Sequence, residues 1–267
     1  MARITAAGTA YELYGQGPAV VLVHGMGLNR AMWQWLLPAL TPRFQVLSFD
    51  LLGHGESANP TGRPDLRTFS AQIVELLDDC GLARCAVVGF SLGGMIARRF
   101  ALDHPDRLSA LAILHSAHDR SAEERAAIGR RVETVHQSGP AATVDAALAR
   151  WFTDAFRTRQ PEMMAAVRSW VTANRKDVYA PIYRVLAEDD AEIADPITEI
   201  RCPTLVMTGA EDVGNSPDMA RRMASAIPGA RIAILPGLRH MALAEDPTTF
   251  NTPVVSFLTE ILVEQAG

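Results

Sequence analysis

Three residue types that cooperate in nucleophilic catalysis stand in this chain in the order serine, aspartate, histidine. Ser91 lies at the centre of residues 89–93, which fit the pattern G-x-S-x-G, and Asp212 and His240 each follow a later apolar run. A serine hydroxyl is a weak nucleophile near neutral pH, so it needs a base within hydrogen-bond reach and a third group that fixes the tautomer of that base. Ser91 is therefore a candidate nucleophile, and His240 and Asp212 are candidates for the base and the acid.

The residues around Ser91 predict a strand, a sharp turn and a helix. Residues 85–88 form a short apolar run and residues 95–102 carry a helical pattern. The glycines on both sides of the serine leave room for backbone to approach closely in such a turn. Free N–H groups at the start of the helix can bind a developing oxyanion. We expect the Leu92 amide to be one such donor.

A second glycine-rich stretch, residues 24–27 (His-Gly-Met-Gly), closes the apolar run 19–23. A continuous apolar run is typical of a parallel strand that is covered on both faces. The backbone N–H of Met26 is the expected second oxyanion donor, and His24 and Gly25 are candidate substrate-binding residues. The alternative for His24 is a structural histidine whose ring only forms hydrogen bonds.

Three motifs occur in a characteristic order: residues 24–27, residues 50–57 (Asp-Leu-Leu-Gly-His-Gly-Glu-Ser) and residues 89–94 (Gly-Phe-Ser-Leu-Gly-Gly). Together they resemble the α/β-hydrolase superfamily, and the resemblance covers nearly the entire chain. It implies an α/β fold with a mostly parallel eight-stranded sheet flanked by helices. It also implies a serine, an acid and a histidine, in that chain order, on loops at the carboxyl edge of the strands. The segment 179–205 is similar to the corresponding part of 3-oxoadipate enol-lactonases.

Other residues compete for the roles of base and acid. The last predicted strand is residues 231–235, and of the seven histidines only His240 follows it. His115 and His118 follow the predicted strand 108–114, so we expect them near the rim of the pocket, where they could contact substrate. Asp119 is the rival acid, because some members of the superfamily place the acid after the preceding core strand.

Strand patterns disappear between residues 119 and 195, where the chain is alanine-rich and helical. The resemblance places here a helical cap inserted after the sixth strand. The predicted domains are a core of residues 1–118 and 196–267 and a cap, or lid, of residues 119–195. A lid would cover the serine, exclude water and shape an apolar pocket, with Trp151 and Trp170 as candidate substrate-binding residues. The alternative is that such aromatic residues only pack the cap helices together.

The composition is that of an ordinary soluble globular protein: 267 residues, of which 48% are hydrophobic and 21% charged, with a formal net charge of -5. There is no basic block or acidic tail, so neither nucleic acid nor a membrane surface is an expected partner. The three cysteines lack metal-ligand spacing, which suits a reducing compartment, and no leader is visible. The expected location is cytoplasmic. The sequence leaves open whether the chain forms a homodimer.

These features favour a serine hydrolase that cleaves a small ester or lactone through an acyl-enzyme intermediate. A serine at the turn argues against haloalkane dehalogenases and epoxide hydrolases, which use aspartate there. Three alternatives stay open: a meta-cleavage carbon–carbon hydrolase, a cofactor-free haloperoxidase and a non-catalytic ligand-binding protein. Arg239 stands before the predicted base, where glycine is common, and its guanidinium could bind a carboxylate or face solvent. The expected partner is a small-molecule substrate, and the mechanism implies no metal or organic cofactor.

Overall fold

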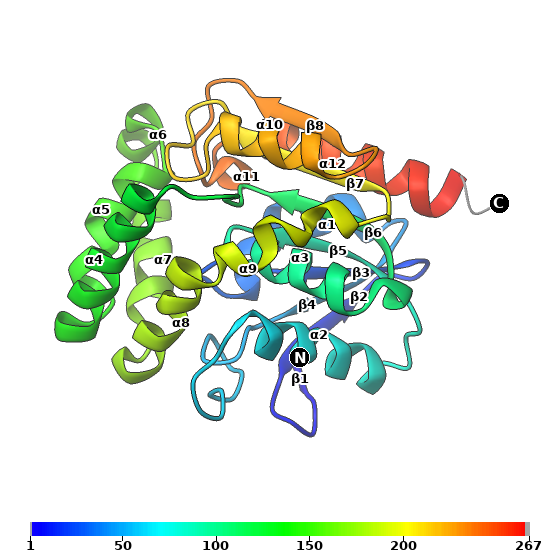
Figure 1. The fold of residues 1–267 in the computed structure, drawn as a ribbon, viewed down its shortest axis with the longest axis horizontal. Helices are drawn as coiled ribbons and strands as arrows, with labels where there is room; N and C mark the ends of the chain where they lie inside the picture. Colours follow the sequence, from blue (N-terminus) through cyan, green and yellow to red (C-terminus); the bar gives the residue numbers. More distant parts are fainter. Residues whose placement is uncertain (1, 265–267) are drawn as a thin grey trace.

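The computed structural model describes residues 2–264, and its strands form one eight-stranded sheet (Figure 1). The strand order is β1-β2-β4-β3-β5-β6-β7-β8. The pairs β1/β2 and β2/β4 are antiparallel, and all other pairs are parallel. The predicted mostly parallel eight-stranded sheet is therefore confirmed. The strands are β1 Arg3–Ile4, β2 Ala10–Tyr14, β3 Ala19–Val23, β4 Gln45–Phe49, β5 Cys85–Phe90, β6 Leu108–Leu114, β7 Thr204–Gly209 and β8 Arg231–Leu235.

The central strands are the apolar runs that the sequence indicates. Every residue of β3 and β5 is buried, as expected for parallel strands with helices on both faces. Strand β7 begins at Thr204. Pro203 directly precedes it and has no N–H to contribute to the sheet.

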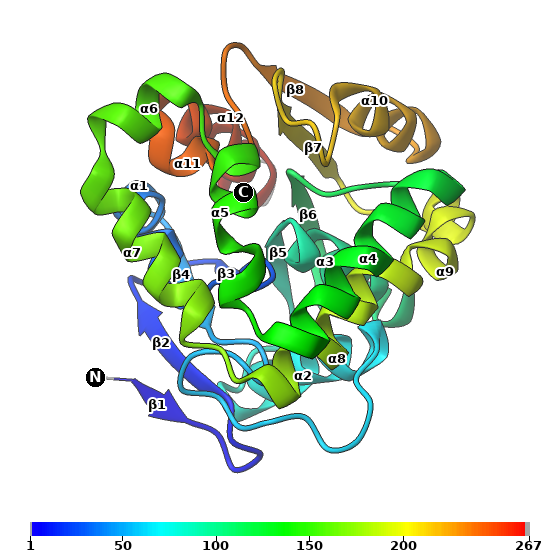
Figure 2. The ribbon, with the colours of Figure 1, turned by 90° about the vertical axis from the view of Figure 1, so that its left-hand side faces the viewer.

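Helices cover both faces of the sheet. Helices α2, α3 and α10 pack on one face, and α1 and α12 on the other (Figure 2). No helix within residues 2–264 is long and apolar enough to cross a membrane. The helices of the core are α1 Leu37–Leu40, α2 Leu66–Asp79, α3 Leu92–Asp103, α10 Pro217–Ala226, α11 Ala242–Glu245 and α12 Pro247–Thr259, with 3-10 segments at Arg30–Trp35, Pro105–Arg107 and Pro196–Glu199 and a π-helical end at Glu260–Glu264.

The turn between β5 and α3 places Ser91 at a sharp corner. Helix α3 begins at Leu92, three residues earlier than predicted, and Ser91 has φ 56° and ψ −114°. A Cβ on Gly93 would lie 2.1 Å from the Val23 carbonyl oxygen, and a Cβ on Gly89 would lie 2.2 Å from the Gly93 carbonyl oxygen. Both glycines are therefore required for the close packing of strand, turn and helix.

A helical insertion follows the sixth strand, between β6 and β7. In Figure 1 helices α4 to α8 of the insertion lie at one end of the sheet, whereas α9 packs against α3, and helices α4 and α8 pack against each other. Helix α4 begins with a capping box in which Ser121 and Glu124 bond to each other's backbone N–H. The division of the chain into a core and a separate cap domain stays a prediction. The helices of the insertion are α4 Ala122–Ser138, α5 Ala141–Trp151, α6 Asp154–Arg159, α7 Pro161–Thr172, α8 Lys176–Glu188 and α9 Asp190–Ala194.

Candidate active site

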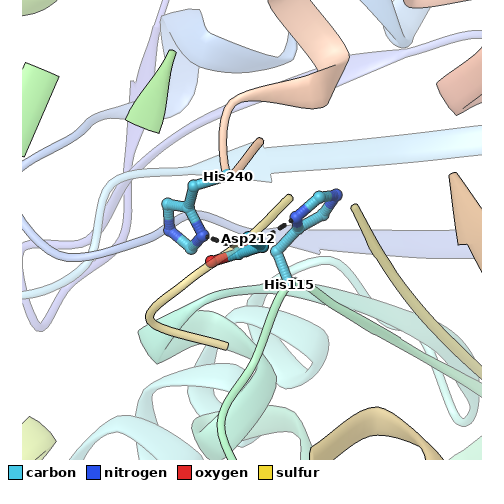
Figure 3. Close-up of side chains that lie close together, drawn as sticks. All are labelled: His115, Asp212 and His240. Carbon is cyan, nitrogen blue, oxygen red and sulfur yellow. Dashed lines mark hydrogen bonds and ion pairs between the residues drawn. The ribbon is translucent and has the colours of Figure 1, made fainter. Parts of the chain in front are cut away.

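The loops after four neighbouring strands meet at the carboxyl edge of the sheet, where open parallel sheets place their ligands. Ser91 follows β5, His115 follows β6, Asp212 follows β7 and His240 follows β8. Figure 3 shows His115 and His240 pointing at Asp212 from two sides. Ser91 and His240 line one cavity, which lies between the sheet edge and the helical insertion.

Asp212 and His240 form a close hydrogen-bonded pair. The Nδ1 of His240 lies 2.7 Å from Oδ2 of Asp212, and both residues are buried. Because an ionised carboxylate only accepts, Nδ1 carries the proton and Nε2 is left free as a base. The other carboxylate oxygen of Asp212 accepts hydrogen bonds from the backbone N–H groups of Gly214 and Asn215. The rival acid Asp119 is exposed and bonds to neither histidine.

His115 is a second histidine on the same carboxylate. Its Nδ1 lies 3.0 Å from Oδ2 of Asp212, and its ring is fully buried against Phe90 and Phe250. Burial by itself raises the pKa of Asp212, but the charge of His240 and the hydrogen bonds from both histidines outweigh this effect, so the pKa lies well below its usual range. The carboxylate therefore stays ionised over the whole physiological range.

The Ser91 side chain is partly exposed to the cavity that also contains His240. Among residues 2–264, no hydrogen bond joins the Ser91 hydroxyl to the His240 ring in this structure. Catalytic hydrogen bonds are often long or poorly aligned in unliganded enzymes and tighten only with substrate.

Two backbone N–H groups near the serine are free. Within the described part of the chain, neither Met26 nor Leu92 donates its N–H to another residue. The loop that holds Met26 is fixed by the ring of His54, whose Nε2 accepts from the Gly27 N–H at 3.1 Å. Both amides are therefore available to a ligand in the cavity.

The candidate substrate-binding residues divide into two groups. Gly25 and Trp151 line the cavity, and the Trp151 ring lies 6.0 Å from that of His240. His24 and Trp170 do not line it. His24 is fully buried and accepts a hydrogen bond from the Leu51 N–H at 2.9 Å. The structure thus gives His24 the structural role that the sequence left as its alternative.

His115 and His118 follow β6, but neither lines the cavity. The Nδ1 of His118 faces the guanidinium of Arg98 instead, at 3.5 Å. Arg239 also points away from the cavity. Its guanidinium donates to the carbonyls of Ala149 and Phe152 at the end of α5.

Sequence reasoning missed several residues of the site. Asn215 lines the cavity, and its side-chain amide lies 3.1 Å from Nδ1 of His240. Three arginines, Arg120, Arg131 and Arg150, line the same cavity. No local pattern marks these residues, because their position depends on how the insertion sits on the sheet.

Among the described residues, one group could offer three ligands to a metal ion: His115, Asp212 and His240. The two nitrogens that face Asp212 are the same atoms that form its hydrogen bonds. A metal ion bound there would replace the interaction that orients the His240 ring, so ion binding and the hydrogen-bonded pair exclude each other.

The eight-stranded sheet and the residues at its carboxyl edge define a class of enzymes in which the turn after the fifth strand carries the reactive residue. The chain belongs to the family described as the alpha/beta hydrolase fold, whose model matches residues 18–247. It is an enzyme of this hydrolase type. One relative is (E)-2-((N-methylformamido)methylene)succinate hydrolase of Acinetobacter baylyi, which is 26% identical, with 93% of each chain covered.

Two solved structures are closely similar to this one. The enol-lactonase from Burkholderia xenovorans LB400 has a TM-score of 0.87 and 30% identity, with 97% of this chain and 100% of that chain covered. A thermophilic esterase from Thermogutta terrifontis, described as malate bound, has a TM-score of 0.87 and 26% identity, with 98% of this chain and 99% of that chain covered. The chain is therefore similar over nearly its whole length to structures named an enol-lactonase and an esterase.

Proposed function

We propose that the protein is a serine hydrolase that cleaves a small ester or lactone through an acyl-enzyme intermediate. The observation that carries the proposal is the buried Asp212–His240 pair, which shares a cavity with Ser91 on its strained turn. The names of the enol-lactonase and esterase relatives support the same type of substrate.

In the first half of the reaction, Nε2 of His240 takes the proton of the Ser91 hydroxyl as its oxygen attacks the substrate carbonyl. The N–H groups of Met26 and Leu92 hold the oxyanion, because they have no other acceptor within the described residues. Asp212 stabilises the imidazolium that forms. His240 then gives its proton to the leaving alkoxide, and the acyl group stays on Ser91.

In the second half, His240 accepts a proton from water while the water oxygen attacks the acyl carbon. The second tetrahedral intermediate collapses, the proton returns to the Ser91 oxygen and the carboxylic acid leaves. In this proposal the helical insertion acts as a lid, since α4, α5, α7 and α8 supply residues that line the cavity. It would exclude bulk water and limit the size of the substrate.

The test is turnover of p-nitrophenyl esters and of a lactone panel by the wild type and the Ser91→Ala variant. We expect the variant to lose roughly 10³-fold or more in kcat. The matched control is Ser116→Ala, because Ser116 is a buried serine after the neighbouring strand that does not line the cavity. It should retain activity.

A mass spectrum of the wild type quenched during turnover should show an acyl group on the peptide that contains Ser91. Full activity of the Ser91→Ala variant, or turnover without an acylated serine, would contradict the covalent mechanism.

A further inference from the structure

The cavity that contains Ser91 and His240 has an unbalanced charge. Arg120, Arg131 and Arg150 line it, and no aspartate or glutamate of residues 2–264 does. Arg120 precedes α4, Arg131 lies on α4 and Arg150 near the end of α5. The positive charge therefore comes from the helical insertion, while the sheet edge contributes the reactive residues.

One of the three arginines has a partner inside the protein. The guanidinium of Arg120 lies 4.0 Å from Oδ1 of Asp190 and donates to the Leu186 carbonyl at 3.0 Å. Its backbone N–H also bonds to Asp190, at 2.8 Å. Arg120 therefore has an anionic neighbour inside the protein, which it shares with Arg98.

The other two arginines have no such partner. Within residues 2–264, neither Arg131 nor Arg150 forms an ion pair or a side-chain hydrogen bond. Both are half-buried, and the Nε of Arg131 is shielded from solvent without an acceptor. Burial, together with the nearby charge of Arg131, lowers the pKa of Arg150. Two like charges thus face one cavity without an anion between them, which is unfavourable unless a ligand supplies one.

The contrast with nearby arginines shows that the arrangement is not general for this chain. Arg168 and Arg239 also lie on or against the insertion, and each pairs with an aspartate. Among the arginines of the insertion that form no ion pair or side-chain hydrogen bond within residues 2–264, Arg130 and Arg159 are exposed to solvent, whereas Arg131 and Arg150 line the cavity. A guanidinium offers a planar set of donors that matches a carboxylate in a bidentate geometry.

We propose that the substrate carries a carboxylate group, which Arg131 and Arg150 bind while the ester or lactone carbonyl lies at Ser91. This inference rests on the proposed hydrolase function, and it adds the chemical class of the substrate. Apolar residues of the same cavity, such as Ile128 and Ala147, suit the carbon chain that would join carboxylate and reacting carbonyl.

The first test compares two substrates that differ only in charge: p-nitrophenyl hexanoate and the mono-p-nitrophenyl ester of adipic acid, which ends in a carboxylate. The glutaric and pentanoic pair repeats the comparison at a shorter length. We expect wild-type kcat/KM to be at least about 10-fold higher for a carboxylate ester than for its neutral match. A wild type that prefers the neutral ester at both lengths would overturn the proposal without any variant.

The second test assigns the preference to residues. Arg131→Met and Arg150→Met should each lower kcat/KM for the carboxylate ester by roughly 10- to 100-fold and change that for the neutral ester by less than about 3-fold. The matched control is Arg130→Met, since Arg130 is the neighbouring, exposed residue on α4. It should leave both values unchanged. Equal losses on both esters would mean a structural role and would refute the inference.

A binding measurement separates this inference from the proposed function. Adipate is titrated into the Ser91→Ala variant, and fluorescence is followed because Trp151 lines the cavity beside Arg150. We expect saturable binding that weakens when Arg131 or Arg150 is replaced by methionine and is partly restored by lysine. If no ester is cleaved but this binding is seen, the hydrolase proposal fails and the anion site stands. If esters are cleaved but no adipate binds, the anion site fails alone.

Discussion

At the scale of single residues, the most unusual feature is a carboxylate shared by two histidines. A triad needs one donor on Asp212, yet His115 and His240 both direct Nδ1 at Oδ2, at 3.0 and 2.7 Å. Burial lowers the pKa of His115, so its ring is neutral and donates one hydrogen bond. A second donor spreads the negative charge of Asp212 and weakens its pull on the proton of His240. In the proposed mechanism His115 would thus be a positioning residue that tunes the base, since it does not line the cavity.

Replacing His115 with Phe should move the acidic limb of the kcat/KM profile to higher pH, by about 0.5 to 1 pH unit. Asp212 would then hold the His240 proton more strongly. His115→Asn is the matched variant, because its Nδ2 occupies the position of the lost donor and Asn tolerates the φ of 49° found there. The His115→Asn variant should have the acidic limb of its kcat/KM profile at the same pH as the wild type. A uniform loss of activity with no change of the limb would show that His115 only fills space.

At the scale of secondary-structure elements, the sequence predicts what depends on neighbouring residues in the chain. The apolar runs of β3 and β5 and the glycines around Ser91 are local signals, and the structure confirms these elements. The orientation of helix α4 is not local. Arg130 faces solvent and Arg131 faces the cavity, one residue apart, and only the packing of the insertion decides which of them does so.

His24, in the motif of residues 24–27, is a residue whose role the sequence could not decide. Its type and place at the end of a strand suit a ligand contact, but its ring is used to bond Leu51 on the adjacent loop. Sequence alone could not separate the two roles, because both need a polar ring at the same edge of the sheet.

The loop that carries His240 is tied to the end of α5 by Arg239. The guanidinium donates to Ala149 and Phe152 and pairs with Asp154, and the Met241 N–H bonds to the Trp151 carbonyl at 2.9 Å. We expect Arg239→Met to lower kcat/KM for neutral and carboxylate esters by the same factor, roughly 3- to 30-fold, because the position of the base is disturbed. The measurement is kcat/KM for p-nitrophenyl hexanoate and for the mono-p-nitrophenyl ester of adipic acid. A selective loss on the carboxylate ester would place Arg239 among the anion-binding residues instead.

Asp189, at the junction between α8 and α9, should make the stability of the protein depend on pH. Burial raises the pKa of Asp189 to about 6 and outweighs the hydrogen bond from the Leu66 N–H. The folded state therefore binds this proton more tightly than the unfolded chain, so the free energy of unfolding falls as pH rises from about 4 to about 6.

Asp189→Asn keeps the acceptor for Leu66 and removes the ionisation. Because the side chain is only half-buried, we expect a gain of about 1 kcal/mol at pH 8 and none at pH 4. Urea unfolding at both pH values measures it. Asp195→Asn, an exposed residue in the same segment, should show no such pH dependence. A gain that is equal at both pH values would contradict the assignment to Asp189.

At the scale of the whole molecule, a buried charge cluster joins the insertion to the core. Arg98 of α3 and Arg120 flank Asp190 of α9, at 3.9 and 4.0 Å, and all three are buried. Burial lowers the pKa of Arg98 to about 10, and its guanidinium also donates to the Ala117 carbonyl at 2.6 Å. One carboxylate here lies beside two guanidiniums from different layers of the fold and offsets only part of their charge. Its loss would leave both charges in the interior.

Asp190→Asn should therefore destabilise the protein by about 3 to 5 kcal/mol, and the sheet and the insertion should unfold in one transition. Urea unfolding followed by far-ultraviolet circular dichroism and by tryptophan fluorescence measures this, since Trp33 lies in the core and Trp170 in the insertion. Asp145→Asn, which removes an exposed ion pair with Arg168, is the contrast and should change little. Adding Arg98→Met to Asp190→Asn should cost less than the sum of the single changes, because it removes one of the unbalanced charges. Two separate transitions in the wild type, or additive losses in the double variant, would show that this cluster does not couple the two parts.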